Sequence, residues 1–393
     1  MAMETDGGAS AEGGVVGTSS STGRGLVNLG GNSCFLSSVL QVLARLPSVR
    51  SLNLCKEGGC AHAFCSSCQL GVLMGELGRN ERGAARADTF YQQLLPAKYD
   101  RPTRASGKAP PPCAIGPDVY QGRQCDAHTL LIGLLDHAGE VATRCQVSGS
   151  ALRDLFQGTL CSTQEWCEAC RHTSEKTETF LTLQLPFEES IDAALSRYFE
   201  AERMSGENQI DCEKCNAKCD GAKRLSIETL PRVVALQLMR FDYKESQAVK
   251  ISDHARFESE QEIGGRSCTL RAIVVHRGGD STESGHYTAW VRIDDSWHHF
   301  DDENVSGPFP FARVQEESAY LLFYEANSPQ VSISRRAQRH LRVPHCCTCD
   351  PLRCTHRRTA LLPPWPWSPR RVTSPARARR RMSPWIPPRV FRR

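Results

Sequence analysis

The chain has 393 residues, of which 40% are hydrophobic and 23% are charged, and its formal net charge is +4. This composition excludes a fibrous or a wholly disordered protein, and no export signal or run of ~20 apolar residues points to secretion or membrane insertion. Nineteen cysteines in such a chain indicate metal ligands and free thiols in a reducing compartment, the cytosol or the nucleus.

The two ends of the chain differ in composition from its middle. Residues 1–24 are rich in Gly, Ser and Thr, whereas residues 331–393 hold sixteen Arg, no Lys and one acidic side chain. We therefore expect a disordered leader at 1–24, a folded domain at 25–327 and a disordered tail at 328–393. The first 330 residues hold 32 basic and 43 acidic side chains, a net charge of −11. This charge suits a basic partner, and only the Arg-rich tail suits nucleic acid.

The first predicted helix begins at Cys34. Its apolar positions recur at helical spacing and end before Pro47: Phe35, Leu36, Val39, Leu40, Leu43 and Leu46. Ser33 can cap this helix, which places the Cys34 sulfur at the positive end of the helix dipole and favours its thiolate. Taken alone, Cys34 is better explained as a buried cysteine of the core, and only its partners change that interpretation. A second helix is expected at 127–142.

Two groups of Cys and His residues have the spacing of metal sites. The pairs Cys167/Cys170 and Cys212/Cys215 each follow a C-x2-C pattern, so they can supply four thiolates to one tetrahedral zinc. A closed shell of four ligands leaves no place for water, and this zinc is expected to be structural. The second group consists of Cys60, His62, Cys65 and Cys68, with Cys55 as an alternative to His62. Free thiols in a surface loop explain this second group nearly as well as a zinc site does.

The second half of the chain is rich in strand-like runs, which are predicted at 233–240, 270–276, 286–293 and 320–324. His286 opens the third run, and Asp294-Asp295 can form the two-residue turn of a hairpin that returns through 296–302. In this register Asp301 lies opposite Thr288, on the same face as His286 and within its reach, while Asp302 points to the other face. Asp301 is therefore the expected partner of His286. A register slip of one residue would give that role to Asp302.

Cys34, His286 and Asp301 together are the parts of a thiol hydrolase. Five segments resemble, in order, blocks of the ubiquitin-specific protease family: Gly25–Phe35 with Leu40-Gln41, Gly122–Leu130 with Leu134–Asp136, Leu230–Phe241, Ser284–Tyr287 and Tyr320–Tyr324. The resemblance covers residues 25–324. It implies an α+β, papain-like fold with a helical thumb, a β-rich palm and zinc-bearing fingers at 161–230.

The resemblance also implies an activity. A member of this family is a deubiquitinase that binds ubiquitin or ubiquitinated proteins and hydrolyses isopeptide or peptide bonds at the C-terminal glycine of ubiquitin. On this interpretation Cys34 is the nucleophile, His286 transfers the proton and Asp301 orients the imidazole. The zinc takes no part in the chemistry.

The chain departs from the family pattern in front of the nucleophile. The family's oxyanion-stabilising Asn lies five residues before the cysteine, whereas the extra glycine of the pair Gly30-Gly31 leaves Asn28 six residues before Cys34. Asn28 or Asn32, one of the two, is expected to supply the donor, with the Cys34 backbone N–H as a further candidate. Loss of one such donor typically lowers the rate ~100-fold to 1000-fold.

Three other interpretations stay open. A displaced Asn28 would leave a catalytically weak pseudoenzyme that binds ubiquitin, and a shared Gly-Gly end would permit a protease for a ubiquitin-like modifier. A zinc-ribbon protein that binds nucleic acid through its Arg-rich arm would explain the cysteine pairs, but it explains none of the five blocks. The presence of Cys34, His286 and Asp301 favours the deubiquitinase.

Overall fold

Helices predominate in the described chain before residue 157, and strands predominate after it. The structure, a computed structural model, describes residues 23–52, 65–79, 81, 83–94, 124–145, 152–164, 167, 170–244, 247–279, 281 and 284–327. All of them belong to one compact unit of the chain, Met1–Leu341. The tail expected at 328–393 and residues 1–22 of the expected leader lie outside the described residues.

Arg24, the last residue of the expected leader, contacts the folded part of the chain. Its Nη1 lies 2.9 Å from a carboxylate oxygen of Glu81, and its Nε donates to the carbonyl oxygen of Gly83 at 2.8 Å. The folded part therefore includes at least this residue in addition to the predicted domain.

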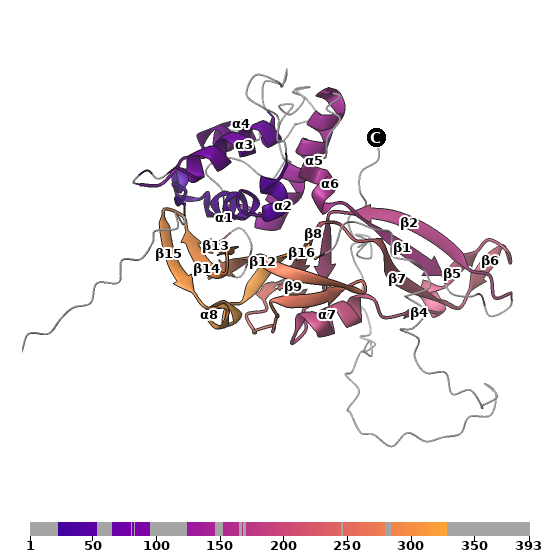
Figure 1. Ribbon diagram of the computed structural model, residues 1–393. Coiled ribbons are helices and arrows are strands. Elements are labelled where there is room, and N and C mark those ends of the chain that lie inside the picture. Colours follow the sequence, from indigo (N-terminus) through magenta and orange to yellow (C-terminus); the bar gives the residue numbers. More distant parts are fainter. Residues whose placement is uncertain are drawn as a thin grey trace, which may run out of the picture. The chain divides into compact units, whose positions relative to one another are not determined.

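The helices of the first half lie together on one face of the large sheet (Figure 1). They are α1 (Cys34–Leu43), α2 (Pro47–Arg50), α3 (Ser66–Leu77), α4 (Asp88–Leu94), α5 (Ala127–Cys145) and α6 (Leu152–Phe156), with the 3-10 turn η1 (Leu29–Gly31) before α1. The two predicted helices are confirmed as α1 and α5. Pro47 does not merely end α1, since it is the first residue of α2, a position that suits its fixed φ. Among the described helices, none is both long enough and apolar enough to cross a membrane.

The large sheet has eight strands in the order β15-β14-β13-β12-β16-β8-β3, with β11 also paired to β12. Their bounds are β3 (Thr182–Leu185), β8 (Val233–Leu238), β11 (Glu260–Ile263), β12 (Arg266–Arg277), β13 (His286–Ile293), β14 (Ser296–Asp301), β15 (Asn304–Phe309) and β16 (Ala319–Ala326). The four predicted strands are confirmed as β8, β12, β13 and β16. Both faces of this sheet are covered, because consecutive residues of a strand, such as Ile273 and Val274 of β12, point to opposite faces and belong to two different hydrophobic cores.

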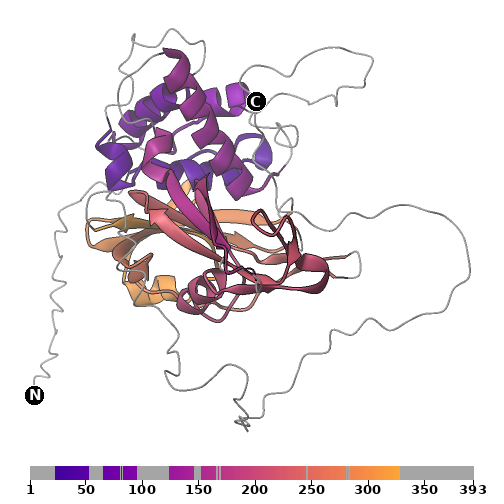
Figure 2. The same ribbon diagram turned by 90° about the vertical axis from the view of Figure 1, so that its right-hand side faces the viewer.

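A smaller four-stranded sheet, in the order β2-β1-β7-β4, extends away from the helices together with the hairpin β5-β6 (Figures 1 and 2). Its bounds are β1 (Gly158–Gln164), β2 (Ser174–Phe180), β4 (Glu202–Met204) and β7 (Gly221–Thr229), and the hairpin is β5 (Ile210–Cys212) and β6 (Ala217–Cys219). The other elements are α7 (Ile191–Tyr198), the 3-10 turn η2 (Gly206–Asn208), the pair β9 (Phe241–Lys244) and β10 (Gln247–Lys250), and α8 (Phe311–Gln315). The small sheet and hairpin occupy the segment that the family resemblance assigns to the fingers.

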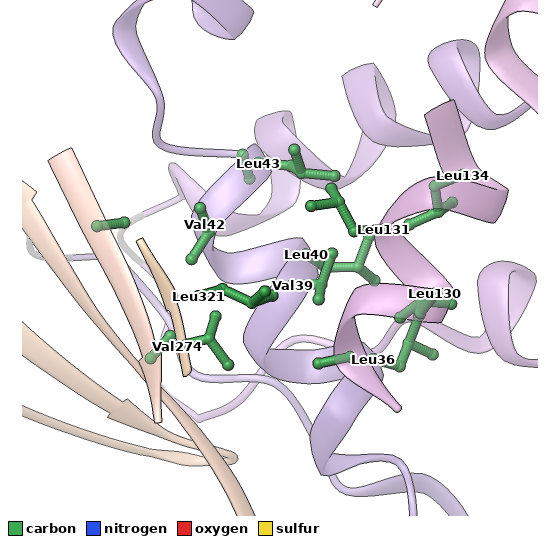
Figure 3. Packing of buried hydrophobic residues seen from close by; sticks show 14 of the residues in the cluster. Leu36, Val39, Leu40, Val42, Leu43, Leu130, Leu131, Leu134, Val274 and Leu321 are labelled. Carbon is green, nitrogen blue, oxygen red and sulfur yellow. The ribbon is translucent and has the colours of Figure 1, made fainter. Parts of the chain in front are cut away.

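Helix α1 is buried on every side, since all ten of its residues are buried. Figure 3 shows Leu40 beside Leu131 of α5 and Val39 beside Leu321 of β16. The helix also packs against β13, the strand that His286 opens. A helix held between α5 and the sheet cannot slide without opening the core, so packing fixes where Cys34 lies relative to β13.

Candidate active site

Cys34 is the first residue of α1 and is 3% exposed. Ser33 occupies the N-cap position, but its side chain makes no capping bond to the helix, so the prediction that Ser33 caps α1 is wrong. Ser33 has φ −98° and ψ 14°, which is outside the extended conformation usual for a capping residue. Its backbone N–H and its hydroxyl both donate to Asn28 Oδ1, at 2.8 and 3.2 Å. The sulfur nevertheless lies at the N-terminal end of a helix, where the dipole favours negative charge.

The hairpin that carries His286 has the predicted register. Ala289 pairs with Phe300 and Ile293 pairs with Ser296, and Asp294 takes the left-handed φ of 54° that tight hairpin turns require. As a result, His286 Nε2 lies 2.6 Å from Asp301 Oδ1. The predicted contact between these two side chains is confirmed.

Cys34 as well as Asp301 affects the protonation of the His286 imidazole. Its hydrogen bond to the Cys34 side chain is the main reason that its pKa is raised to about 9; partial burial opposes the shift, and the hydrogen bond to Asp301 supports it. Because Asp301 takes Nε2, the ring nitrogen that faces Cys34 is Nδ1. At neutral pH the imidazole is therefore mostly protonated, and a cation beside the sulfur favours the thiolate.

Asp302 turns toward the site, so the prediction that it points to the other face is wrong. Strand alternation ends with β14 at Asp301, and Asp302 takes a left-handed φ of 49°. Its carboxylate comes within 4.8 Å of the ligand atoms of His286 and Asp301. Burial raises the pKa of Asp302, an effect that the charge of His286 and a hydrogen bond from Asn28 oppose.

Asn28 links this acid to the helix that carries the nucleophile. Its Nδ2 donates to Asp302 Oδ2 at 2.7 Å while its Oδ1 accepts from Ser33. The backbone N–H of Leu26 donates to the Asp302 carbonyl oxygen at 2.8 Å, which ties the segment before Asn28 to the same turn. An amide nitrogen carries two hydrogens, so one remains for an oxyanion beside Cys34.

The extra glycine is taken up by the turn η1. Gly30 and Gly31 have φ values of 67° and 74°, a left-handed conformation that costs glycine little, and the chain thereby tightens between Asn28 and α1. A Cβ on Gly30 would collide with the Tyr91 hydroxyl, whereas Gly31 has open space around it. Of the two candidate amides, Asn28 lies against the acids and α1, and Asn32 is an exposed residue.

Five cysteine sulfurs gather at the hairpin β5-β6, beside the segment between β1 and β2. Cys167 Sγ lies 3.2 Å from Cys215 Sγ, and Cys170 Sγ lies 3.6 Å from Cys212 Sγ. The predicted convergence of these four cysteines is confirmed. A fifth, Cys219, was missed, although its place on the return strand after Cys215 was visible in the sequence. We call these five residues the finger cluster.

The finger cluster has the chemistry of a zinc site. Its donors are all thiols, and the backbone N–H of Cys215 donates to Cys212 Sγ at 3.4 Å, so the turn presents this sulfur with its charge partly satisfied. Left-handed residues, Arg171 and Asn216, follow each C-x2-C pair and close the turns. The residues present therefore fit a tetrahedral tetrathiolate metal.

The second predicted metal group lies mostly outside the described residues. Cys60 and His62 are not described, nor is the alternative ligand Cys55. Cys65 and Cys68 are described at the start of α3, where Cys65 Sγ accepts from the backbone N–H of Cys68 at 3.4 Å. A metal at this position stays a prediction.

Comparison with known proteins identifies a family whose members resemble this chain. The sequence model described as "ubiquitin carboxyl-terminal hydrolase" matches residues 24–324. Ubiquitin carboxyl-terminal hydrolases 26 and 23 of Arabidopsis thaliana are 29% and 30% identical to the chain over 73% and 77% of its length. The chain spans only 26% and 35% of those two relatives. A probable ubiquitin carboxyl-terminal hydrolase 16 of Schizosaccharomyces pombe is 27% identical over 78% of the chain and 68% of the relative.

A solved structure shares the fold. The SAGA Ubp8/Sgf11/Sus1/Sgf73 DUB module bound to ubiquitin aldehyde contains a chain that superposes with a TM-score of 0.62. The match covers 78% of this chain and 70% of that one at 24% sequence identity. The predicted α+β fold of the ubiquitin-specific protease type is confirmed.

Proposed function

This chain belongs to the ubiquitin carboxyl-terminal hydrolase family, and on that premise we propose that it is a cysteine-dependent deubiquitinase with its catalytic domain at 25–327. The observation that carries the proposal is the position of His286. Its Nε2 lies 2.6 Å from Asp301 Oδ1, and the Cys34 side chain is near enough to be the largest cause of its raised pKa. Three residues from a buried helix and a distant hairpin meet in the order that a thiol hydrolase requires.

In the proposed reaction the Cys34 thiolate attacks the carbonyl carbon of the terminal glycine of ubiquitin, which the scissile bond joins to the leaving amine. The negative charge that develops on the carbonyl oxygen is stabilised by the second amide hydrogen of Asn28 and by the N-terminal end of α1. His286 then gives its proton to the departing amine, which leaves a thioester on Cys34. Water, deprotonated by the now neutral His286, hydrolyses the thioester and restores the thiolate.

Asp301 and Asp302 have separate roles in this proposal. Asp301 holds His286 in the tautomer that faces Cys34 and stabilises its protonated form. Asp302 accepts a hydrogen bond from Asn28 and not from the imidazole, so its role is to position the oxyanion donor. This division supports Asn28, not Asn32, as the donor, and the tightened turn η1 supports an active enzyme over a disabled one.

We further propose that the finger cluster holds zinc through its thiolates, as a structural metal. When bound, zinc would cross-link the segment at Cys167 to the hairpin β5-β6, where short strands alone offer little stability. The cluster lies on the segment between β1 and β2 and on the hairpin β5-β6, and the catalytic side chains come from α1, β13 and β14. The residues of the reaction and those of the metal are therefore distinct.

The proposed substrate is ubiquitin or a ubiquitinated protein in the cytosol or nucleus. Support comes from the family and from the structural neighbour, which is bound to ubiquitin aldehyde. A net charge of −11 over the first 330 residues would also attract a basic segment of substrate.

The proposal is tested by turnover of ubiquitin that carries a fluorogenic amide at its C-terminus, with a ubiquitin-like modifier carrying the same group in parallel. We expect release of the fluorophore from ubiquitin, its loss in Cys34→Ser, and unchanged release in Cys161→Ser, which removes a thiol from β1. Turnover of the modifier alone would reassign the substrate. Binding of ubiquitin without any turnover would show a pseudoenzyme.

A further inference from the structure

The finger cluster contains one more thiol than a tetrahedral zinc can use. The geometry of the hairpin explains why the fifth sulfur is there. Ile210 pairs with Cys219 and Cys212 pairs with Ala217. Residues two apart on a strand share a face, so Cys219 lies on the same face as Cys212 and diagonal to it. The small Ala217, directly opposite Cys212, leaves room above that face.

The distances place Cys219 among the potential ligands. The sulfurs of Cys167, Cys212, Cys215 and Cys219 all lie within 4.8 Å of one another. Cys170 adjoins the same group, with its Sγ at 3.6 Å from Cys212 Sγ. Sulfurs around one zinc lie about 3.8 Å apart when each Zn–S bond is about 2.3 Å long. Both Cys170 and Cys219 are therefore close enough to complete the shell.

We propose that Cys167, Cys212 and Cys215 are constant ligands of one zinc ion, and that Cys170 and Cys219 exchange at the fourth position. This inference rests on the proposed zinc site and goes beyond it, because the two C-x2-C pairs alone predict a fixed set without Cys219. In an exchange, one Zn–S bond breaks and one forms. The departing sulfur takes up the proton that the incoming thiol releases, so the charge of the site is unchanged.

The exchange has a structural consequence. Cys170 belongs to the segment before β2, while Cys219 belongs to β6. With Cys170 bound, both ends of the site are cross-linked by two ligands each. With Cys219 bound, three ligands come from the hairpin region, only Cys167 comes from the other segment, and the tip of the fingers gains freedom to adjust.

The test uses the full chain and metal content as its readout. Cys170→Ser, Cys219→Ser and the double variant are purified with zinc, challenged with a chelator and assayed for retained zinc. Replacement of zinc by Co²⁺ reports the ligand set through the absorption of cobalt–thiolate bonds. Cys212→Ser serves as the control for a constant ligand, Cys161→Ser as the control for an unrelated thiol, and elution volume in gel filtration reports folding.

We expect both single variants to keep zinc and a four-thiolate cobalt spectrum under chelator conditions in which the double variant and Cys212→Ser lose the metal. Loss of zinc by either single variant would overturn the exchange, because the cysteine that remains would then be unable to serve as the fourth ligand. Retention by the double variant would also overturn it. A wild-type chain that binds no zinc would overturn the proposed zinc site itself, a failure distinct from that of the exchange.

Discussion

The protonated imidazole of His286 has two tasks in the first step of the proposed reaction, since it favours a thiolate beside it and then protonates the leaving amine. Its pKa is raised to about 9 by the hydrogen bond to Cys34 and by Asp301. The protonated form is therefore present below that pH and is lost as the pH rises through it. The buried His276 does not contribute to the loss of activity at alkaline pH, because burial lowers its pKa to about 4.

We expect kcat/KM to fall as the pH rises through about 9, because kcat/KM follows the ionisation of the free enzyme. In Asp301→Asn the carboxylate that supports the imidazolium is gone, so the alkaline limb should move to lower pH and the maximal rate should fall. A pH profile of both proteins measures this. An alkaline limb that stays in place in Asp301→Asn would contradict the assigned role of Asp301.

Gly30 and Gly31 offer a matched pair of substitutions at the residue scale. Both have left-handed φ values, so alanine costs about 1–2 kcal/mol at either site. Only at Gly30 does the new Cβ meet the Tyr91 hydroxyl. We expect Gly30→Ala to lower activity more than Gly31→Ala does. When the Tyr91 hydroxyl is first removed by Tyr91→Phe, adding Gly30→Ala should cost no more activity than Gly31→Ala costs in the wild-type chain. Equal losses at the two glycines would show that η1 does not depend on this contact.

At the scale of the elements, the burial of α1 accounts for the precision of the site. Leu40 is fully buried, and its removal leaves a cavity between α1 and α5. Leu40→Ala should lower the free energy of unfolding by about 2–5 kcal/mol. Val72, on α3, is 37% exposed, and Val72→Ala should change that free energy by less than about 0.5 kcal/mol. Urea unfolding compares them, and similar losses would contradict the packing described for α1.

The elements near the site could be predicted because they follow simple periods. The apolar residues of α1 repeat at helical spacing, and β13 and β14 alternate around a two-residue turn, so the contact of His286 with Asp301 followed from register alone. Asp302 could not be placed in this way, because its left-handed φ lies beyond the strand end, where alternation carries no information. The missing cap at Ser33 could not be predicted either, because its backbone departs from the extended conformation usual for an N-cap residue.

The small sheet was the least predictable element. Five of the seven residues of β2, Glu175–Thr179, are exposed, so the strand shows no apolar alternation. Its pairing with β1 is decided by partners distant in sequence, such as Phe180 opposite Gly158, where a larger residue would clash with the ring. Cys219 was overlooked because it follows no C-x2-C spacing, although hairpin pairing brings it to the cluster.

At the scale of the whole molecule, the proposed zinc site and the proposed catalytic residues lie on different sheets. The family resemblance implies that the fingers grip ubiquitin, so removal of zinc by a chelator should raise KM for a ubiquitin substrate. The alkylation rate of Cys34 by a small reagent should stay the same, because α1 and β13 carry no ligand of the finger cluster. Loss of alkylation in step with zinc would contradict this separation.

The central claim is that Cys34 is the nucleophile that attacks the C-terminal glycine of ubiquitin. The most direct measurement is mass spectrometry after incubation with ubiquitin that bears a C-terminal electrophile. The wild-type chain and Cys161→Ser should each gain the mass of one ubiquitin, located on Cys34, and Cys34→Ser should gain none. An unlabelled wild-type chain, or an adduct that persists in Cys34→Ser, would contradict the account.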